Sequence, residues 1–190
     1  MLINLLASCF FSNKIYMAAS LNKNYIPGAR ALFIVILATL LDDVAYYFFD
    51  SSKFPLSNFS SIFYFGEIII ACLFLCVAGR LFGGSVRQCT FLAVFKGFSY
   101  TLSPVIFGSL WMIWLAAFTD LNITYHKAFN IGGLVVLMCW LWVCQYIFVM
   151  TYFSKLKKSR QLILFVGIIA IYLGAQEFKE FAYLFLSGSQ

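Results

Sequence analysis

The fold of this chain is decided by residues 62–82, IFYFGEIIIACLFLCVAGRLF. Its charged side chains are confined to Glu67 near one end and Arg80 near the other. About 20 predominantly apolar residues in a helix, at roughly 1.5 Å per residue, cross the roughly 30 Å hydrocarbon core of a bilayer. The stretch therefore predicts a transmembrane helix.

The composition of the whole chain agrees with this prediction. Hydrophobic residues make up 63% of it, charged residues 11%, and the mean hydropathy is +0.93, far from the usage of globular domains. A chain of 190 residues has room for about five spans with short loops and no separate soluble domain. The net charge of +6 is spread over short loops, which favours anionic lipid headgroups over nucleic acid as the partner.

Four further apolar stretches flank the first one, so the expected fold class is all-α and polytopic. The five predicted spans cover about residues 31–49, 62–82, 90–118, 128–153 and 161–185. They form one membrane domain, residues 26–186, which is preceded by an interfacial N-terminal segment, residues 1–25, and followed by a C-terminal tail, residues 187–190.

The third predicted span, residues 90–118, is too long for one untilted crossing. It also contains Pro104, which removes a backbone hydrogen bond and clashes with the preceding helical turn. We therefore expect this span to be kinked, or split into two half-helices, at Pro104.

The charged residues are sorted between alternate junctions of the spans. Ten of the 13 Lys and Arg residues fall on one side, namely Lys14, Lys23, Arg30, Arg80, Arg87, Lys96, Lys155, Lys157, Lys158 and Arg160. The other three, Lys53, Lys127 and Lys179, fall on the opposite side together with all seven Asp and Glu residues. By the positive-inside rule we expect a cytoplasmic N-terminus and an outside C-terminus. Lys155, Lys157, Lys158 and Arg160 are expected to contact lipid headgroups on the cytoplasmic side.

The N-terminal segment and the cysteines lead to two further expectations. The segment is expected to form a short helix on the cytoplasmic leaflet, with its polar side formed by Asn4, Ser8, Asn13 and Lys14. The six cysteines are expected to remain reduced thiols, and Cys72 and Cys76 to be small buried hydrophobic residues. Cys72 and Cys76 share a helix face, but no histidine or second cysteine pair completes a site, so no metal and no cofactor is expected.

Residues 67–110 resemble the Yip domain family of Ypt-interacting membrane proteins, especially its short bacterial members. The matching elements are Arg80-Leu81-Phe82-Gly83-Gly84, then Arg87-Gln88, then Tyr100 to Pro104, with Ser99 where the family has glycine. The basic turn SKLKKSRQLILFVG, residues 154–167, is similar to a turn of that family as well. The resemblance implies five spans with a cytoplasmic N-terminus, the bacterial inner membrane, and a role of ill-defined type. The long cytosolic region of eukaryotic members is missing, so their trafficking role does not transfer.

Four carboxyl groups lie in the predicted outer half of the membrane: Asp42 and Asp43 about 16 Å along the first span, Glu67 about 8 Å from the outer end of the second, and Glu177 about 24 Å along the fifth. Buried charges cost several kcal/mol and mark candidate functional sites. They indicate either a cation or proton site, or structural pairing with Lys53 or Lys179 near the outer headgroups.

Enzymatic motifs are missing from the sequence. It contains no Gly-x-Ser-x-Gly, no His-Glu-x-x-His and no glycine-rich phosphate loop, and its single histidine, His126, lies in an expected outer loop. We therefore expect a non-enzymatic scaffold or partner-binding protein, with a small transporter or channel component as the alternative. Gly79, Gly83, Gly132 and Gly133 serve either internal packing or association with a membrane partner or a second copy.

Overall fold

The computed structural model describes residues 2–10, 13–20, 26–49, 54–118 and 123–187, and within these ranges it leaves the side chains of 2, 20, 46–49, 54–60, 116–118, 123–131, 134, 180 and 182–187 undescribed. Lys23 and Lys53, the side chains of His126 and Lys127, and most of the predicted tail therefore lie outside the described part.

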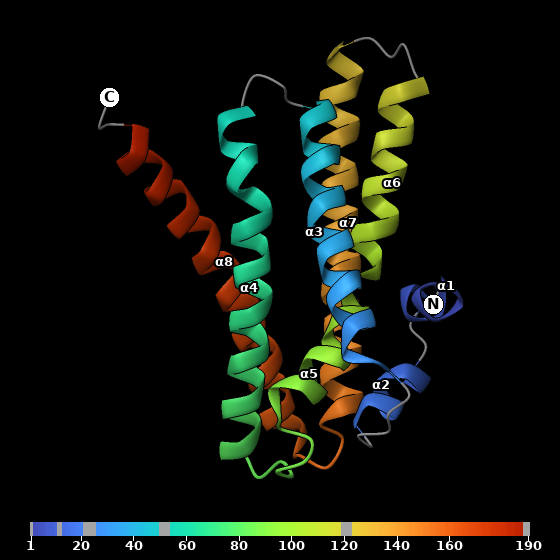
Figure 1. Cartoon of the computed structure of the whole chain (residues 1–190), viewed down its shortest axis with the longest axis vertical. Helices are drawn as coiled ribbons and strands as arrows, with labels where there is room; N and C mark the ends of the chain where they lie inside the picture. Colours follow the sequence, from blue (N-terminus) through green and yellow to red (C-terminus); the bar gives the residue numbers. More distant parts are fainter. Residues whose placement is uncertain (1, 11–12, 21–25, 50–53, 119–122, 188–190) are drawn as a thin grey trace.

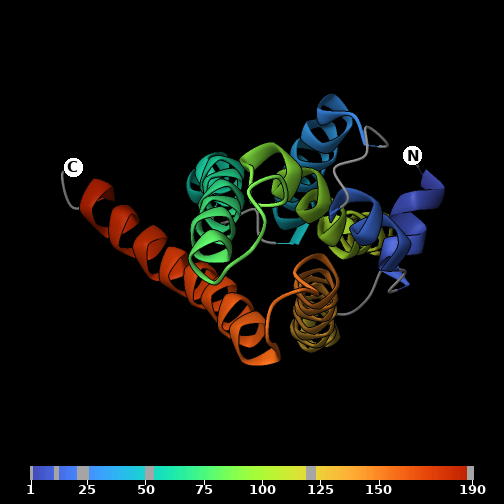
Figure 2. The ribbon, with the colours of Figure 1, turned by 90° about the horizontal axis from the view of Figure 1, so that it is seen from below.

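Every regular element in the described ranges is helical, which confirms the all-α class there. In chain order the elements are α1 (Leu2–Cys9), α2 (Asn13–Ser20), α3 (Gly28–Phe49), α4 (Phe54–Leu81), α5 (Phe91–Phe98), the 3-10 helix η2 (Ser99–Leu102), α6 (Ser103–Phe118), α7 (Ile123–Tyr152) and α8 (Lys158–Ser187). The helices α3, α4, α6 and α7 run along the long axis of the molecule, and α8 is tilted away from them (Figures 1 and 2).

Four segments of the described chain are long and apolar enough to cross a membrane. They are Ser61–Leu81, Phe91–Leu115, Val135–Tyr152 and Lys158–Lys179, which correspond to the second to fifth predicted spans. The protein is therefore a helical membrane protein. The first predicted span corresponds to α3, which packs along α4 and α6 inside the same bundle.

The third span is split, as predicted, and the break lies just before Pro104. Helix α5 lies at an angle to α6, and the 3-10 turn Ser99–Leu102 joins them (Figure 1). Pro104 is the second residue of α6, a position where its missing N–H removes no helical hydrogen bond. Ser99 Oγ donates to the Lys96 carbonyl (3.0 Å) and Thr101 Oγ1 to the Phe98 carbonyl (2.7 Å), which satisfies polar backbone in a buried turn.

The end of α4 is set by the two glycines that follow it. Gly83 has φ +96°, its N–H donates to the Arg80 carbonyl (3.0 Å), and the Gly84 N–H donates to the Gly79 carbonyl (2.8 Å). These two bonds define a Schellman motif, which requires a residue that tolerates positive φ. A Cβ on Gly84 would lie 2.7 Å from Cys89 Sγ, so this second glycine is needed for space.

The N-terminal helices pack against the bundle beside α6 and α7 (Figure 1). Asn13 and Lys14 are exposed, as expected for a polar face. The prediction for Ser8 was wrong, because this residue is buried and its Oγ donates to the Leu5 carbonyl (2.9 Å) and to Ser103 Oγ (3.0 Å). Trp140 Nε1 donates to the Cys9 carbonyl (2.8 Å), so α6 and α7 satisfy polar groups at the end of α1.

Basic side chains of the described chain gather at one end of the bundle, where α3 begins, α4 ends, α5 lies and α7 turns into α8. We call this the basic end. Its residues are Arg30, Arg80, Arg87, Lys96, Lys155, Lys157, Lys158 and Arg160. The acidic residues Asp42, Asp43, Glu67 and Glu177 lie on the helices farther from it.

Candidate functional site: an interior polar cavity

A cavity of about 190 Å³ lies among the five long helices, in the half of the bundle away from the basic end. Its polar lining residues come from four helices: Asp42 of α3, Tyr64 and Glu67 of α4, Ser109 of α6, and Tyr172, Gln176 and Lys179 of α8. Apolar side chains of α6 and α7, among them Val105 and Leu141, and the indole of Trp142 close the rest. The volume is sufficient for several water molecules or for a small ion with part of its hydration shell.

The two carboxylates of the cavity come from neighbouring antiparallel helices and are offset along the bundle. Asp42 is 14 positions after Gly28, the start of α3, and Glu67 is 14 positions before Leu81, the end of α4. These two helix ends are not level, because α4 extends beyond the start of α3 (Figure 1). The Ser61 N–H donates to Asp43 Oδ2, so Glu67, six positions farther along α4, lies about 9 Å nearer the basic end than Ser61 does. The antiparallel pairing of α3 and α4 thus brings together two acidic residues that are 25 positions apart in the sequence.

Lys179 of α8 interacts electrostatically with both Asp42 and Glu67. One ammonium group balances only one of two ionised carboxylates. Where the dielectric constant is low, an uncompensated negative charge favours the uptake of a proton or a small cation. The cavity therefore has the charge pattern of a monovalent cation or proton site.

The other two predicted acidic residues lie elsewhere. Asp43 does not line the cavity, and its Oδ2 accepts a hydrogen bond from the backbone N–H of Ser61 in α4 (3.1 Å). Glu177 is exposed on α8, although it lies only two positions from Lys179. The structure thus joins two of the four predicted carboxylates in one cavity.

A buried polar group that the sequence analysis did not single out lies beside the cavity. Gln145 of α7 is fully buried, and its Nε2 donates to the hydroxyl of Tyr172 (3.2 Å), whose ring centroid is 6.4 Å from that of Tyr64. Within the described residues, Gln145 Oε1 and Trp142 Nε1 are buried without a hydrogen-bond partner. An unpaired buried donor is costly, so Trp142 Nε1, whose residue lines the cavity, is suited to donate a hydrogen bond to water there. A single glutamine inside the apolar run of residues 135–150 was the available sequence signal.

The lining of the cavity provides mainly oxygen donors, which favour the binding of hard cations. Among the described residues no group of three or more His, Cys, Asp or Glu side chains converges as a metal site would. The carboxylates, tyrosine hydroxyls and the Gln176 amide provide oxygen atoms, which suit a proton, water or an alkali cation.

The motif that carries the family resemblance forms a corner at the basic end, distant from the cavity. Besides the turn Arg80–Gly84, Tyr100 is fully buried in η2, and the Gln88 carbonyl accepts a hydrogen bond from Tyr152 Oη (2.7 Å). Arg87 is exposed in the same loop. These residues connect α4, α5 and α7 and do not line the cavity.

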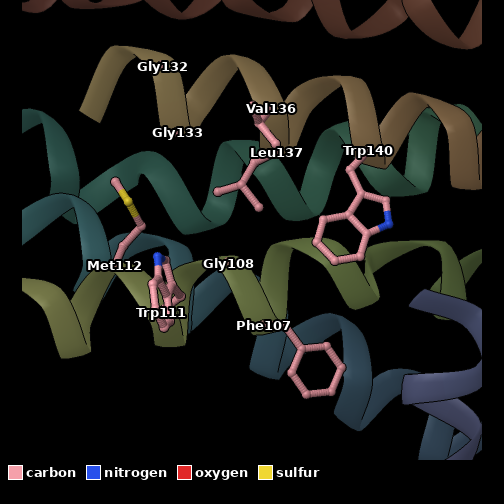
Figure 3. A pocket seen from close by; sticks show the side chains of 9 residues that line it. All are labelled: Phe107, Gly108, Trp111, Met112, Gly132, Gly133, Val136, Leu137 and Trp140. Atoms are coloured by element: carbon pink, nitrogen blue, oxygen red, sulfur yellow. The ribbon is translucent and has the colours of Figure 1, made fainter. Parts of the chain in front are cut away.

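A second hollow is an apolar groove between α6 and α7. Its volume is about 680 Å³, and Trp111 and Met112 of α6 face Gly132, Gly133 and Val136 of α7 across it (Figure 3). Among the described atoms none lies within 4 Å of a Cβ built on Gly132, and only Met112 Sδ, at 3.8 Å, approaches one built on Gly133. These two glycines are therefore not used for tight packing within the described part of the chain.

The fold and the cavity define the class of the molecule: an α-helical integral membrane protein with a polar interior cavity. No protein family, no curated protein and no solved structure matches this chain.

Proposed function

We propose that this chain is a small transporter or channel component that binds a monovalent cation or a proton at Asp42 and Glu67. The observation that carries the proposal is the cavity in which these two carboxylates meet Lys179. Ionisable groups at membrane depth are costly to bury, and ion and proton pathways are among the functions that retain them.

The proposed membrane arrangement has five spans, with α3 as the first. The basic end lies in the cytoplasm of a bacterium, the N-terminus is on the same side, and the C-terminus is outside. The gathering of Arg80, Arg87, Lys155 and their neighbours at one end supports this orientation, because cytoplasmic loops retain Lys and Arg. Glu67 lies about 21 Å along α4 from Leu81, at the basic end, so in a hydrocarbon core of roughly 30 Å the cavity lies in the outer half.

The experiment is a flux measurement in proteoliposomes with dyes for protons, sodium and potassium. We expect the native protein to pass one of these ions, and Asp42→Asn or Glu67→Gln to reduce its flux at least tenfold. Asp43→Asn and Glu177→Gln are matched controls that remove the same charges outside the cavity, and they should retain most of the flux. Absence of flux in the native protein, or equal losses in all four variants, contradicts the proposal.

A second candidate function is the binding of a partner protein as a non-enzymatic scaffold, the role expected from the sequence, which contains no enzymatic motif. The groove between α6 and α7 favours it, because Gly132 and Gly133 are free to let another transmembrane helix approach closely. The occupant that we propose is one transmembrane helix of another membrane protein.

This candidate is tested by photo-crosslinking in native membranes. A benzoylphenylalanine in place of Val136 in the groove should give one discrete protein adduct, and Gly133→Leu should abolish it. The same probe in place of Val166, which is exposed on α8, is the control and should not give that adduct. Identical adducts from both positions contradict a specific interface.

A further inference from the structure

A third hollow lies at the basic end, between the last turns of α7 and the first turn of α8. Its volume is about 630 Å³. Residues of both helices and of the turn between them line it, among them Tyr146, Met150, Ser154, Lys158, Ser159 and Leu162. We call it the α7–α8 groove.

The lining of the α7–α8 groove is polar at one end and apolar at the other. Ser154, Lys158 and Ser159 lie where α7 has ended and α8 begins, among the other cations of the basic end. Tyr146 is six positions before the end of α7, which places it about 9 Å deeper along the helix. Leu162 is four positions into α8, about 6 Å deeper.

Hydrogen bonds and ring contacts hold the walls of the groove in place. Gln161 is buried, and its Nε2 donates to the Phe153 carbonyl (2.7 Å), which ties α8 to the end of α7. The Tyr146 ring lies edge-on to Phe165, with centroids 5.3 Å apart. Arg160 donates a hydrogen bond to the carbonyl of Phe82, just after the end of α4, and does not line the groove. Of the four basic residues in this segment, Lys155, Lys157, Lys158 and Arg160, only Lys158 lines the groove.

We propose that the α7–α8 groove binds one anionic phospholipid. The phosphate lies against Lys158 and the hydroxyl of Ser159, at the N-terminus of α8, where the first backbone N–H groups and the helix dipole favour an anion. One acyl chain lies deeper, against Tyr146, Met150 and Leu162. An ammonium group beside apolar walls in one groove is complementary to an amphiphile, whereas a soluble phosphate would leave the apolar walls exposed. This inference is independent of the proposed ion site.

The test is native mass spectrometry of the full-length protein in a non-ionic detergent, with palmitoyl-oleoyl phosphatidylglycerol or phosphatidylcholine added at equal concentration. We expect about fivefold more bound phosphatidylglycerol, which corresponds to about 1 kcal/mol from one lysine near an anionic headgroup. Lys158→Gln should reduce this to the level of phosphatidylcholine. Lys155→Gln removes the same charge from the same turn outside the groove and should leave the preference within about twofold.

Two further measurements separate the sources of the phosphate and the contribution of the apolar wall. Leu162→Asn, at a position whose side chain is half exposed, should reduce retention of phosphatidylglycerol at unchanged helicity and monodispersity. Soluble glycerophosphate should not displace the lipid. Four results would each overturn the proposal. In the native protein they are equal retention of both lipids and displacement of the lipid by glycerophosphate. In the variants they are equal losses in Lys158→Gln and Lys155→Gln, and unchanged retention in Leu162→Asn.

Discussion

Arg160, in the first turn of α8, donates a hydrogen bond from Nη1 to the backbone carbonyl of Phe82 just after the end of α4 (2.6 Å). The two residues are 78 positions apart, and the bond joins the helices that carry Glu67 and Lys179. It also places a cation at the C-terminus of α4, where the helix dipole is negative. A contact at the basic end thus helps to set how α8 meets α4 beside the polar cavity.

Removal of this bond should destabilise the protein moderately. For Arg160→Gln we expect a loss of about 1 kcal/mol in the free energy of unfolding, typical of one partly exposed hydrogen bond. The thermal midpoint in detergent measures it. Lys157→Gln removes a charge from the same turn and is the control, and an equal decrease in that variant would show that the loss is a general charge effect.

Substitution of Gly83 should disrupt the end of α4. An L-residue at φ +96° is strained, so we expect Gly83→Ala to cost about 1–2 kcal/mol. Gly174→Ala is the matched control, because no described atom lies within 4 Å of its Cβ position and alanine favours the helix. Equal thermal midpoints for the two variants would contradict the requirement for glycine at residue 83.

The close approach of α5 to α7 at Gly97 should be equally sensitive. A Cβ on this residue would lie 2.6 Å from Cε2 of Phe148, a fully buried ring. We expect Gly97→Ala to lower stability by about 1–3 kcal/mol through overpacking. Gly66→Ala in α4 has open space around its Cβ position among the described atoms and should have a much smaller effect.

Lys179 should compensate the carboxylates of the cavity. Lys179→Gln leaves Asp42 and Glu67 without their ammonium partner, so we expect a loss of about 2 kcal/mol in stability. Asp42→Asn in the same chain should recover part of that loss, because it removes one of the two unbalanced charges. A double-mutant cycle by thermal unfolding measures the coupling, and strictly additive losses would show that the groups do not interact.

The thiol of Cys89, in the loop between α4 and α5, should react slowly. Its burial raises the pKa of the thiol above the ordinary value, and the nearby Arg80 opposes this only in part. Only the thiolate is nucleophilic, so a raised pKa reduces the reactive fraction near pH 8, and reactivity should increase as the pH rises further. Maleimide labelling followed by peptide mapping measures this. A cysteine introduced as Val86→Cys, at an exposed position of the same loop, should be labelled much faster.

Much of the helical organisation could be predicted from local patterns. Apolar runs with Arg80 and Lys158 at their ends predict membrane helices, because lipid excludes both charge and unpaired backbone. The split of the third span could be predicted from Pro104, although the turn itself lies at Ser99–Leu102. The pair Gly83-Gly84 ends α4, whereas the pair Gly132-Gly133 lies inside α7, so a glycine pair by itself does not predict the end of a helix.

The site depended on helix rotation and on which helices are neighbours, and neither is encoded in a local pattern. Asp42 and Asp43 are adjacent in sequence, but consecutive residues of a helix point about 100° apart, so one faces the cavity and the other bonds to α4. Likewise Ser8 was predicted to lie on a polar surface, whereas the structure buries it against Ser103. Gln145 was not singled out from the sequence, and its role became visible only from its hydrogen bond to Tyr172.

The sequence alone thus predicted that the chain is helical, that its helices are apolar enough to cross a membrane, and that most of its cations lie on one side, because hydropathy and charge act within single helices. Only the packing of α3, α4 and α8 makes Asp42, Glu67 and Lys179 neighbours, because their proximity depends on how deep each residue lies and on how each helix is rotated in the bundle.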